Sequence, residues 1–142
     1  MKIRLLMLGK TRRPELCGIL DDYVKRIGRS NKIEVTEVRD GDAALKKLEA
    51  SRGAETVLLD AGGNTMDSED FARWIRERRD RGMKELAFVC GDADGFPKAV
   101  RELVKAKISL SEMTYSHELA RVMLAEQIYR ALAILAGSAY PK

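Results

Sequence analysis

Short apolar runs and longer amphipathic stretches alternate along the whole chain. The apolar runs have the length and continuity of buried strands, and they occur at 3–8, 33–38, 56–60, 86–90 and 108–110. The run at 33–38 alternates apolar and polar side chains, which predicts a half-exposed strand near an edge of the sheet. The run at 56–60 is expected to stop at the segment 61–64, which contains two glycines.

The amphipathic stretches between these runs predict helices. Ser68 is the expected N-cap of the third helix, and Pro97 precedes the fourth. The predicted helices cover about 14–27, 43–50, 68–81, the segment after Pro97, and 116–136. Because strands alternate with helices, the sequence predicts an α/β fold with a mostly parallel sheet flanked by helices.

The last predicted helix has no wide polar face. Its apolar residues occur on every side: Leu119, Ala120, Val122, Met123, Leu124, Ala125, Ile128, Tyr129, Ala131, Leu132, Ala133, Ile134 and Leu135. A helix of this kind must be buried on more than one side. One side can pack on the sheet, and we expect the other to contact a second subunit, which predicts a homodimer through this helix.

Composition narrows the class of protein. The chain has 142 residues, of which 45% are apolar and 34% charged, as expected for one domain spanning 1–142. No apolar run approaches the roughly 20 residues of a membrane span, and the apolar start is too short for a signal peptide. Cys17 and Cys90 lie far apart in apolar segments, which favours free buried thiols in a reducing, cytoplasmic location. His117 is the only histidine, so we expect no metal site.

The charge balance points to a polyanionic partner without establishing one. The formal net charge is +4 and the pI is about 9.1. Basic residues gather in two clusters, one from Lys2 to Arg13 and one from Arg73 to Lys84. Such clusters are typical of nucleic-acid binding, although a solvated helix face would have the same composition.

Familiar nucleotide and hydrolase motifs are absent from the sequence. It contains no complete phosphate loop, no GxGxxG after a strand and no GxSxG. In parallel sheets ligands bind beyond the carboxyl ends of the strands, which selects the segments 59–63, 91–95 and 110–115. Gly91 permits either close approach to a flat ligand or a plain strand-to-helix turn, and Gly95 permits a second reversal before Pro97.

Four segments carry a resemblance to a known family: Val57–Asp60, Phe88–Phe96, Leu110–Thr114 and His117–Ala131. The most specific is Leu-Ser-x-Met-Thr followed by His-x-x-x-Arg-x-x-x-x-Glu-x-x-Tyr-Arg. Through these motifs the chain resembles, over nearly its full length, the RlmH-type 23S ribosomal RNA pseudouridine N3-methyltransferases of the SPOUT superfamily.

The resemblance implies a fold, a cofactor and a substrate. Its fold is an α/β sheet whose C-terminal part forms a trefoil knot, and the knot holds S-adenosylmethionine. Members are homodimers that methylate N3 of a pseudouridine in helix 69 of large-subunit RNA within the assembled ribosome. By position, the cofactor-binding residues are Leu59, Gly91, Leu110, Ser111, Glu112, Met113, Thr114 and Tyr115.

The resemblance also implies candidate catalytic and RNA-binding residues. The transferred methyl group is already activated, so the protein must chiefly position the reactants and assist removal of the N3 proton. His117, Arg121 and Tyr140 are the catalytic candidates, and Arg130 and Lys142 are the candidate RNA contacts. Two structural alternatives stay open: His117 as a helix-start hydrogen-bonding residue, and Arg130 in an ordinary helix salt bridge with Glu126.

The C-terminal tail leaves an alternative function open. Tyr140-Pro141-Lys142 keeps the tyrosine and the terminal basic residue of the family tail, but its two histidines are missing. The alternative is a SPOUT-fold protein that binds RNA or the ribosome with altered or lost methyltransferase activity.

Overall fold

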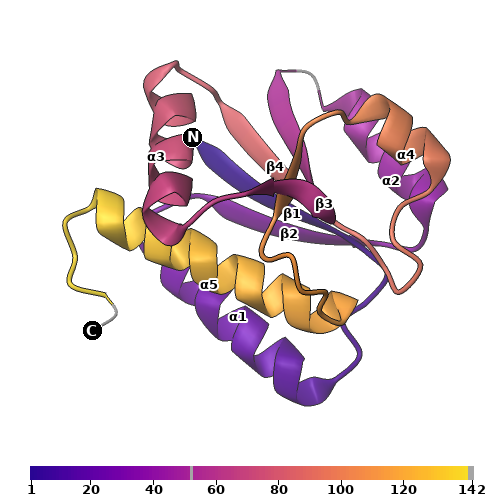
Figure 1. Ribbon diagram of the computed structural model, residues 1–142, viewed down its shortest axis with the longest axis horizontal. Helices are drawn as coiled ribbons and strands as arrows, with labels where there is room; N and C mark the ends of the chain where they lie inside the picture. Colours follow the sequence, from indigo (N-terminus) through magenta and orange to yellow (C-terminus); the bar gives the residue numbers. More distant parts are fainter. Residues whose placement is uncertain (52, 141–142) are drawn as a thin grey trace.

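The computed structural model describes residues 1–51 and 53–140. Within them lies a five-stranded parallel sheet in the order β2-β1-β4-β3-β5 (Figure 1). The strands are β1 (Lys2–Leu8), β2 (Ile33–Val38), β3 (Ala54–Thr65), β4 (Glu85–Cys90) and β5 (Lys107–Ser109). The predicted α/β class and parallel sheet are therefore confirmed, and β2 lies at a sheet edge as its period-two pattern indicates.

Helices cover both faces of the sheet (Figure 1). They are α1 (Pro14–Gly28), α2 (Gly41–Ala50), α3 (Ser68–Asp80), α4 (Lys98–Leu103) and α5 (His117–Leu135). Alternate residues of β1 serve the two faces: Leu5 packs with α1, α3 and α5, whereas Leu6 packs with α2 and α4. The strands are almost continuously apolar because both faces are buried.

Helix α5 lies between α1 and α3, which explains much of its all-round apolar character. The Tyr23 and Tyr129 ring centroids are 6.1 Å apart across the α1–α5 contact, and Ser68 Oγ of α3 donates to Gln127 Oε1 at 2.7 Å. Leu119 and Ile134 nevertheless stay 38% and 36% exposed on α5. On α5 these two are the large apolar side chains that the described part of the chain leaves exposed.

Strand β3 does not stop at residues 61–64 as expected; it continues to Thr65. Its pairing with β5 shifts register between Leu59 and Asn64, and the second part pairs Asn64 with Ile108. A Cβ on Gly63 would lie 2.7 Å from the main-chain nitrogen of Ile108. Gly63, the second of the two glycines that suggested a strand end, is therefore what lets β5 approach the β3 backbone.

Three smaller predictions of element ends were also wrong. The N-cap of α3 is Asp67, whose carboxylate accepts from Asp70 N at 2.7 Å, because the Ser68 hydroxyl is used to reach α5. Helix α2 begins at Gly41, since Asp40 caps it through Ala43 N. Leu110 lies just beyond β5. None of the helices in the described part of the chain is long and apolar enough to cross a membrane.

Candidate functional site

A pocket of about 220 Å³ opens at the carboxyl ends of β4 and β5 and beside residues 59–61 of β3, where the pairing with β5 shifts register. Its walls come from the three segments that the strand-end rule selects, together with Arg101 of α4 and the first turn of α5. Seven of the eight predicted cofactor residues line this pocket: Leu59, Gly91, Leu110, Ser111, Met113, Thr114 and Tyr115. Glu112 is the exception, because it is exposed and absent from the lining.

The turn that follows β4 forms one wall and explains Gly91. Gly95 has a φ of +82°, and its amide and carbonyl exchange hydrogen bonds with Asp92 at 3.0 and 3.3 Å. A Cβ on Gly91 would lie 2.7 Å from the Gly95 carbonyl oxygen. The glycine at position 91 is therefore required by the strand-to-helix turn itself, while the residue also lines the pocket.

Serines give the opposite wall its shape. Ser109 Oγ donates to Ser111 O at 2.8 Å and accepts from Ser111 N at 3.2 Å, and Ser111 Oγ accepts from Met113 N at 3.0 Å. Residues 110–115 belong to no helix or strand, so their main-chain groups are not used in the sheet. Met113 is 75% exposed above them.

An ion pair that sequence reasoning missed lies at the rim. Asp60 Oδ2 accepts from Arg101 Nη1 at 2.7 Å, and Asp60 Oδ1 accepts from Gly62 N at 3.0 Å. The Gly62 hydrogen bond and the Arg101 guanidinium lower the pKa of Asp60. Asp60 could have been found from the sequence, because it is an acidic residue at the end of an apolar run. No sequence pattern predicts that Arg101 lies beside it.

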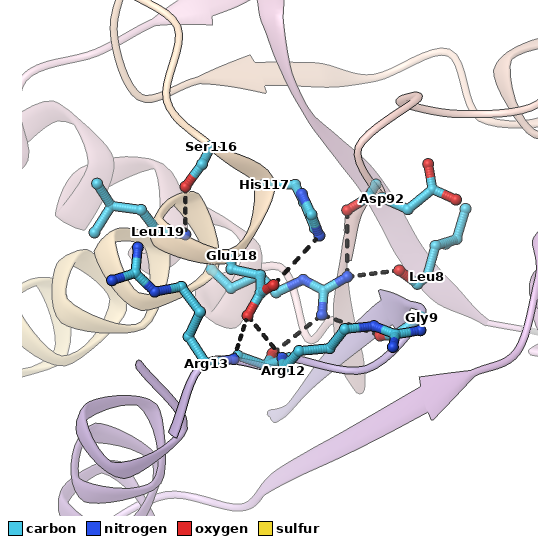
Figure 2. Close-up of polar contacts among 12 residues, drawn as sticks. Leu8, Gly9, Arg12, Arg13, Asp92, Ser116, His117, Glu118 and Leu119 are labelled. Carbon is cyan, nitrogen blue, oxygen red and sulfur yellow. Dashed lines mark hydrogen bonds and ion pairs between the residues drawn. The ribbon is translucent and has the colours of Figure 1, made fainter. Parts of the chain in front are cut away.

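His117 lies at the mouth of the pocket, where α5 begins. Its side chain is 29% exposed, and Nε2 is 3.9 Å from Glu118 Oε2. The helix is capped by Ser116, whose hydroxyl accepts from Leu119 N at 3.3 Å (Figure 2). The cap is thus supplied by Ser116, and the imidazole is left facing the cleft.

Glu118 joins the start of α5 to the loop after β1. Its Oε1 accepts from Arg12 N at 2.7 Å and from Arg13 N at 2.9 Å (Figure 2). These main-chain hydrogen bonds, together with the nearby His117 and Arg121, lower the pKa of Glu118.

Arg121 is completely buried below the pocket floor. Its guanidinium donates to Leu8 O at 2.6 Å, Gly9 O at 3.0 Å and Thr11 Oγ1 at 3.1 Å, and to Gly91 O at 3.3 Å. Four acceptors from the ends of β1 and β4 therefore share this one side chain. The arrangement suits a residue that fixes the pocket floor rather than one that meets a substrate.

Tyr140, which follows the end of α5, packs against Arg130 of that helix, and both lie outside the pocket lining. Glu126 Oε1 accepts from Arg130 Nη2 at 2.8 Å and from Tyr140 Oη at 3.2 Å. The expected i,i+4 salt bridge is therefore present. Burial and the neighbouring Tyr23 and Glu126 raise the pKa of Tyr140, which suits a donor and not a proton acceptor. Lys142 lies outside the described residues.

The two cysteines are free, and no metal site is found among the described residues. Cys90 is buried, which raises the pKa of its thiol to about 12. Cys17 is half-buried and donates to Thr11 O at 3.0 Å. Within residues 1–51 and 53–140 no three His, Cys, Asp or Glu side chains are close enough to hold a metal ion.

The lining fits the cofactor that the resemblance implies. Leu59 and Leu110 offer apolar contact for a purine ring. Ser111 N, Ser111 O and Met113 N already bind serine hydroxyls, and the other main-chain groups of 110–115 offer donors and acceptors for the edge of the ring. Asp92 supplies negative charge for a cationic ligand, whereas the Asp60 carboxylate is already paired with Arg101. S-adenosylmethionine matches these features of the lining, because it has a purine ring and two positively charged groups, an ammonium and a sulfonium.

Comparison with known proteins gives a family and relatives that match along nearly the whole chain. The family described as "Predicted SPOUT methyltransferase" matches residues 1–141. Proteins called ribosomal RNA large subunit methyltransferase H from Dinoroseobacter shibae and Gemmatimonas aurantiaca are 40% and 37% identical to this chain. The alignment with the first protein covers 99% of this chain and 98% of that protein. The alignment with the second covers the full length of both.

A solved structure shows the shared fold. The crystal structure of TrmJ from Z. mobilis ZM4 aligns with a TM-score of 0.55 and 11% identity, over 92% of this chain and 69% of that chain. Since the family match covers residues 1–141 and the relatives align over nearly their full length, the chain belongs to the SPOUT methyltransferase family.

Proposed function

We propose that the protein methylates N3 of a pseudouridine in helix 69 of large-subunit ribosomal RNA, within the assembled ribosome. Transfer of a methyl group to ribosomal RNA follows from the family, and S-adenosylmethionine is the methyl donor. The observation that carries the finer proposal is the strand-end pocket with His117 at its mouth. A methyl donor held in the pocket and a base entering from solvent would meet at that residue.

The pocket residues have separate tasks in this proposal. When bound, S-adenosylmethionine supplies an activated methyl group on a sulfonium sulfur. Leu59, Leu110 and the main chain of 110–115 hold the purine end, and Asp92 faces the positive charges, while Asp60 stays paired with Arg101. Arg121 keeps the floor in place by joining Gly91 O to Leu8 O. Precise positioning is the main catalytic contribution that such a site can make.

His117 is the proposed proton acceptor. An imide N3–H is a weak acid, so a nearby base assists its removal as the methyl group is transferred. An imidazole can accept a proton near neutral pH, whereas the buried Arg121 guanidinium cannot. Tyr140, with its raised pKa, donates a hydrogen bond more readily than it accepts a proton.

The remaining parts of the proposal concern the whole protein. The chain is one domain, residues 1–142, whose C-terminal part forms the trefoil knot of the SPOUT fold. It acts in the cytoplasm as a homodimer through α5, and Arg130 and Lys142 contact RNA phosphates. The exposed Leu119 and Ile134 support the dimer, and the net charge of +4 supports a polyanionic substrate.

The decisive experiment supplies tritiated S-adenosylmethionine and ribosomes that lack the modification. We expect label in helix 69, located by nuclease mapping, and none in ribosomes already modified. His117→Ala should lower the single-turnover rate by about 10²–10⁴-fold, while calorimetry shows unchanged cofactor affinity.

The same measurements separate the alternative function. Cofactor binding by calorimetry with no label in the RNA would refute the enzyme and favour an RNA- or ribosome-binding protein. The observation that favours this alternative is that Tyr140, a catalytic candidate, binds Glu126 of α5 and lies outside the pocket lining.

A further inference from the structure

The sequence places one basic cluster between Lys2 and Arg13, and the fold divides it in two. Lys2 and Arg4 lie near the start of β1, where carboxylates pair with them: Lys2 Nζ is 2.6 Å from Glu34, and Arg4 Nη2 is 3.0 Å from Glu85. Lys10, Arg12 and Arg13 follow the other end of β1, in the loop 9–13. The charges of Lys2 and Arg4 are therefore paired with carboxylates, whereas the side chains of the three basic residues in loop 9–13 are paired with none in the described part of the chain.

The three loop cations are exposed and available. Their side chains face solvent, and none of the ion pairs within residues 1–51 and 53–140 involves Lys10, Arg12 or Arg13. Two carboxylates lie close by, but both bind main-chain amides. Glu37 accepts from Thr11 N at 2.9 Å, and Glu118 accepts from Arg12 N and Arg13 N.

The backbone of loop 9–13 is held by several further contacts. Gly9 N donates to Val38 O at 2.7 Å, and Gly9 itself has a φ of +80°. Arg121 donates to Gly9 O and Thr11 Oγ1, and Cys17 Sγ donates to Thr11 O. A fixed backbone that carries free cations is preorganised, because its ordering cost is met before any ligand arrives.

These contacts place the loop beside the pocket. Glu118, which binds the loop, follows His117 at the pocket mouth (Figure 2). Arg121 joins the loop to Gly91 of the pocket wall. We propose that Lys10, Arg12 and Arg13 bind phosphates of the RNA strand that presents the target base, and that Glu118 is the positioning residue that holds them there. This inference rests on the proposed function and assigns it an RNA-contact surface.

The test measures binding of labelled protein to ribosomes that lack the modification, between about 50 and 200 mM KCl. Arg12→Ala with Arg13→Ala should weaken binding and lower the slope of log affinity against log salt by about one for each cation removed. Calorimetry should show unchanged S-adenosylmethionine affinity, since neither residue lines the pocket.

Arg29→Ala with Lys32→Ala is the matched control. It removes the same charge from exposed positions in the α1–β2 turn, at the opposite end of the sheet. We expect this control variant to keep the ribosome affinity of the wild-type protein and the same slope of log affinity against log salt. Wild-type behaviour of the loop variant, or an equal loss in the control, would overturn the inference.

Glu118 is tested by its own pair of variants. Glu118→Ala should weaken ribosome binding, and Glu118→Gln should restore part of it, because the amide oxygen can still accept from a main-chain amide. A Gln variant as weak as the Ala variant would refute the positioning role. Binding is measured without methyl transfer, so failure of the loop and failure of the proposed reaction give different results.

Discussion

Arg121 shows how much of the site depends on one buried side chain. A single guanidinium serves acceptors that follow β1 and β4, two strands that are neighbours in the sheet. Strand ends in a parallel sheet expose carbonyl groups that need donors, and a rigid fork of donors suits them. The sequence marked this arginine as catalytic because of its motif, whereas its burial could be seen only once the last helix was placed.

We expect Arg121→Met to lower the free energy of unfolding by about 2–4 kcal/mol, because several buried carbonyl groups lose their donor. Urea unfolding measures the change. Arg73→Met is the control, since its i,i+3 pair with Asp70 is exposed and should contribute less than about 0.5 kcal/mol. Equal effects of the two substitutions would contradict the structural role of Arg121.

Glu118 predicts a pH dependence of the loop. Its pKa is lowered in the folded protein, so its contribution to stability is present above the ordinary glutamate pKa and is lost as pH falls through the lowered value. The Arg12 and Arg13 amide proton shifts should therefore titrate together, with a midpoint below that of an ordinary glutamate. NMR of labelled protein measures this, and Glu118→Gln should abolish the shared titration. A midpoint at or above the ordinary value would contradict the assignment.

At the scale of elements, periodicity predicted the order of strands and helices because each element buries an apolar face that the period reveals. Periodicity gave wrong element ends where a residue makes its contact with a segment that is distant in the sequence. Gly62 and Gly63 suggested a strand end, yet the strand continues and Gly63 permits β5 to approach β3. Ser68 suggested a cap, yet its hydroxyl reaches Gln127 of α5.

Gly63→Ala should destabilise the protein by about 1–3 kcal/mol and weaken cofactor binding, since the added methyl meets the Ile108 backbone and moves the neighbouring pocket wall. Thermal unfolding and calorimetry measure the two effects. Gly62→Ala is the matched control, because its nearest neighbour would be Asp60 Oδ1 at an ordinary 3.7 Å. If both variants behave alike, the close β3–β5 approach does not constrain position 63.

At the scale of the whole molecule, the strand-end rule located the pocket before any side chain was placed. Seven of the eight cofactor candidates line it because chain order and strand direction bring their segments to one edge. The rule could not indicate which side chains are bound by other residues of the same chain and so do not face a ligand. Arg130 and Tyr140 share Glu126, and Arg101 reaches the pocket from a helix that carried no motif.

Leu119→Glu with Ile134→Glu should convert the proposed homodimer into a monomer, because the two exposed apolar residues on α5 would then bring charges into the interface. Sedimentation velocity at micromolar concentration measures the change. Leu103→Glu is the control, since Leu103 is 47% exposed on α4, a helix on the other face of the sheet. A wild-type protein that sediments as a monomer would refute the dimer.

The contacts of Arg121 also affect the order in which the chain can fold while it is being synthesised. They span 112 and 113 positions between α5 and the end of β1, so the first strand emerges from the ribosome long before its donor. Until α5 is made, the carbonyl groups at that end of the sheet must remain hydrated. Contacts of such separation form late, after shorter loops have closed. A nascent chain can therefore build most of its sheet and still lack a finished methyl-donor pocket.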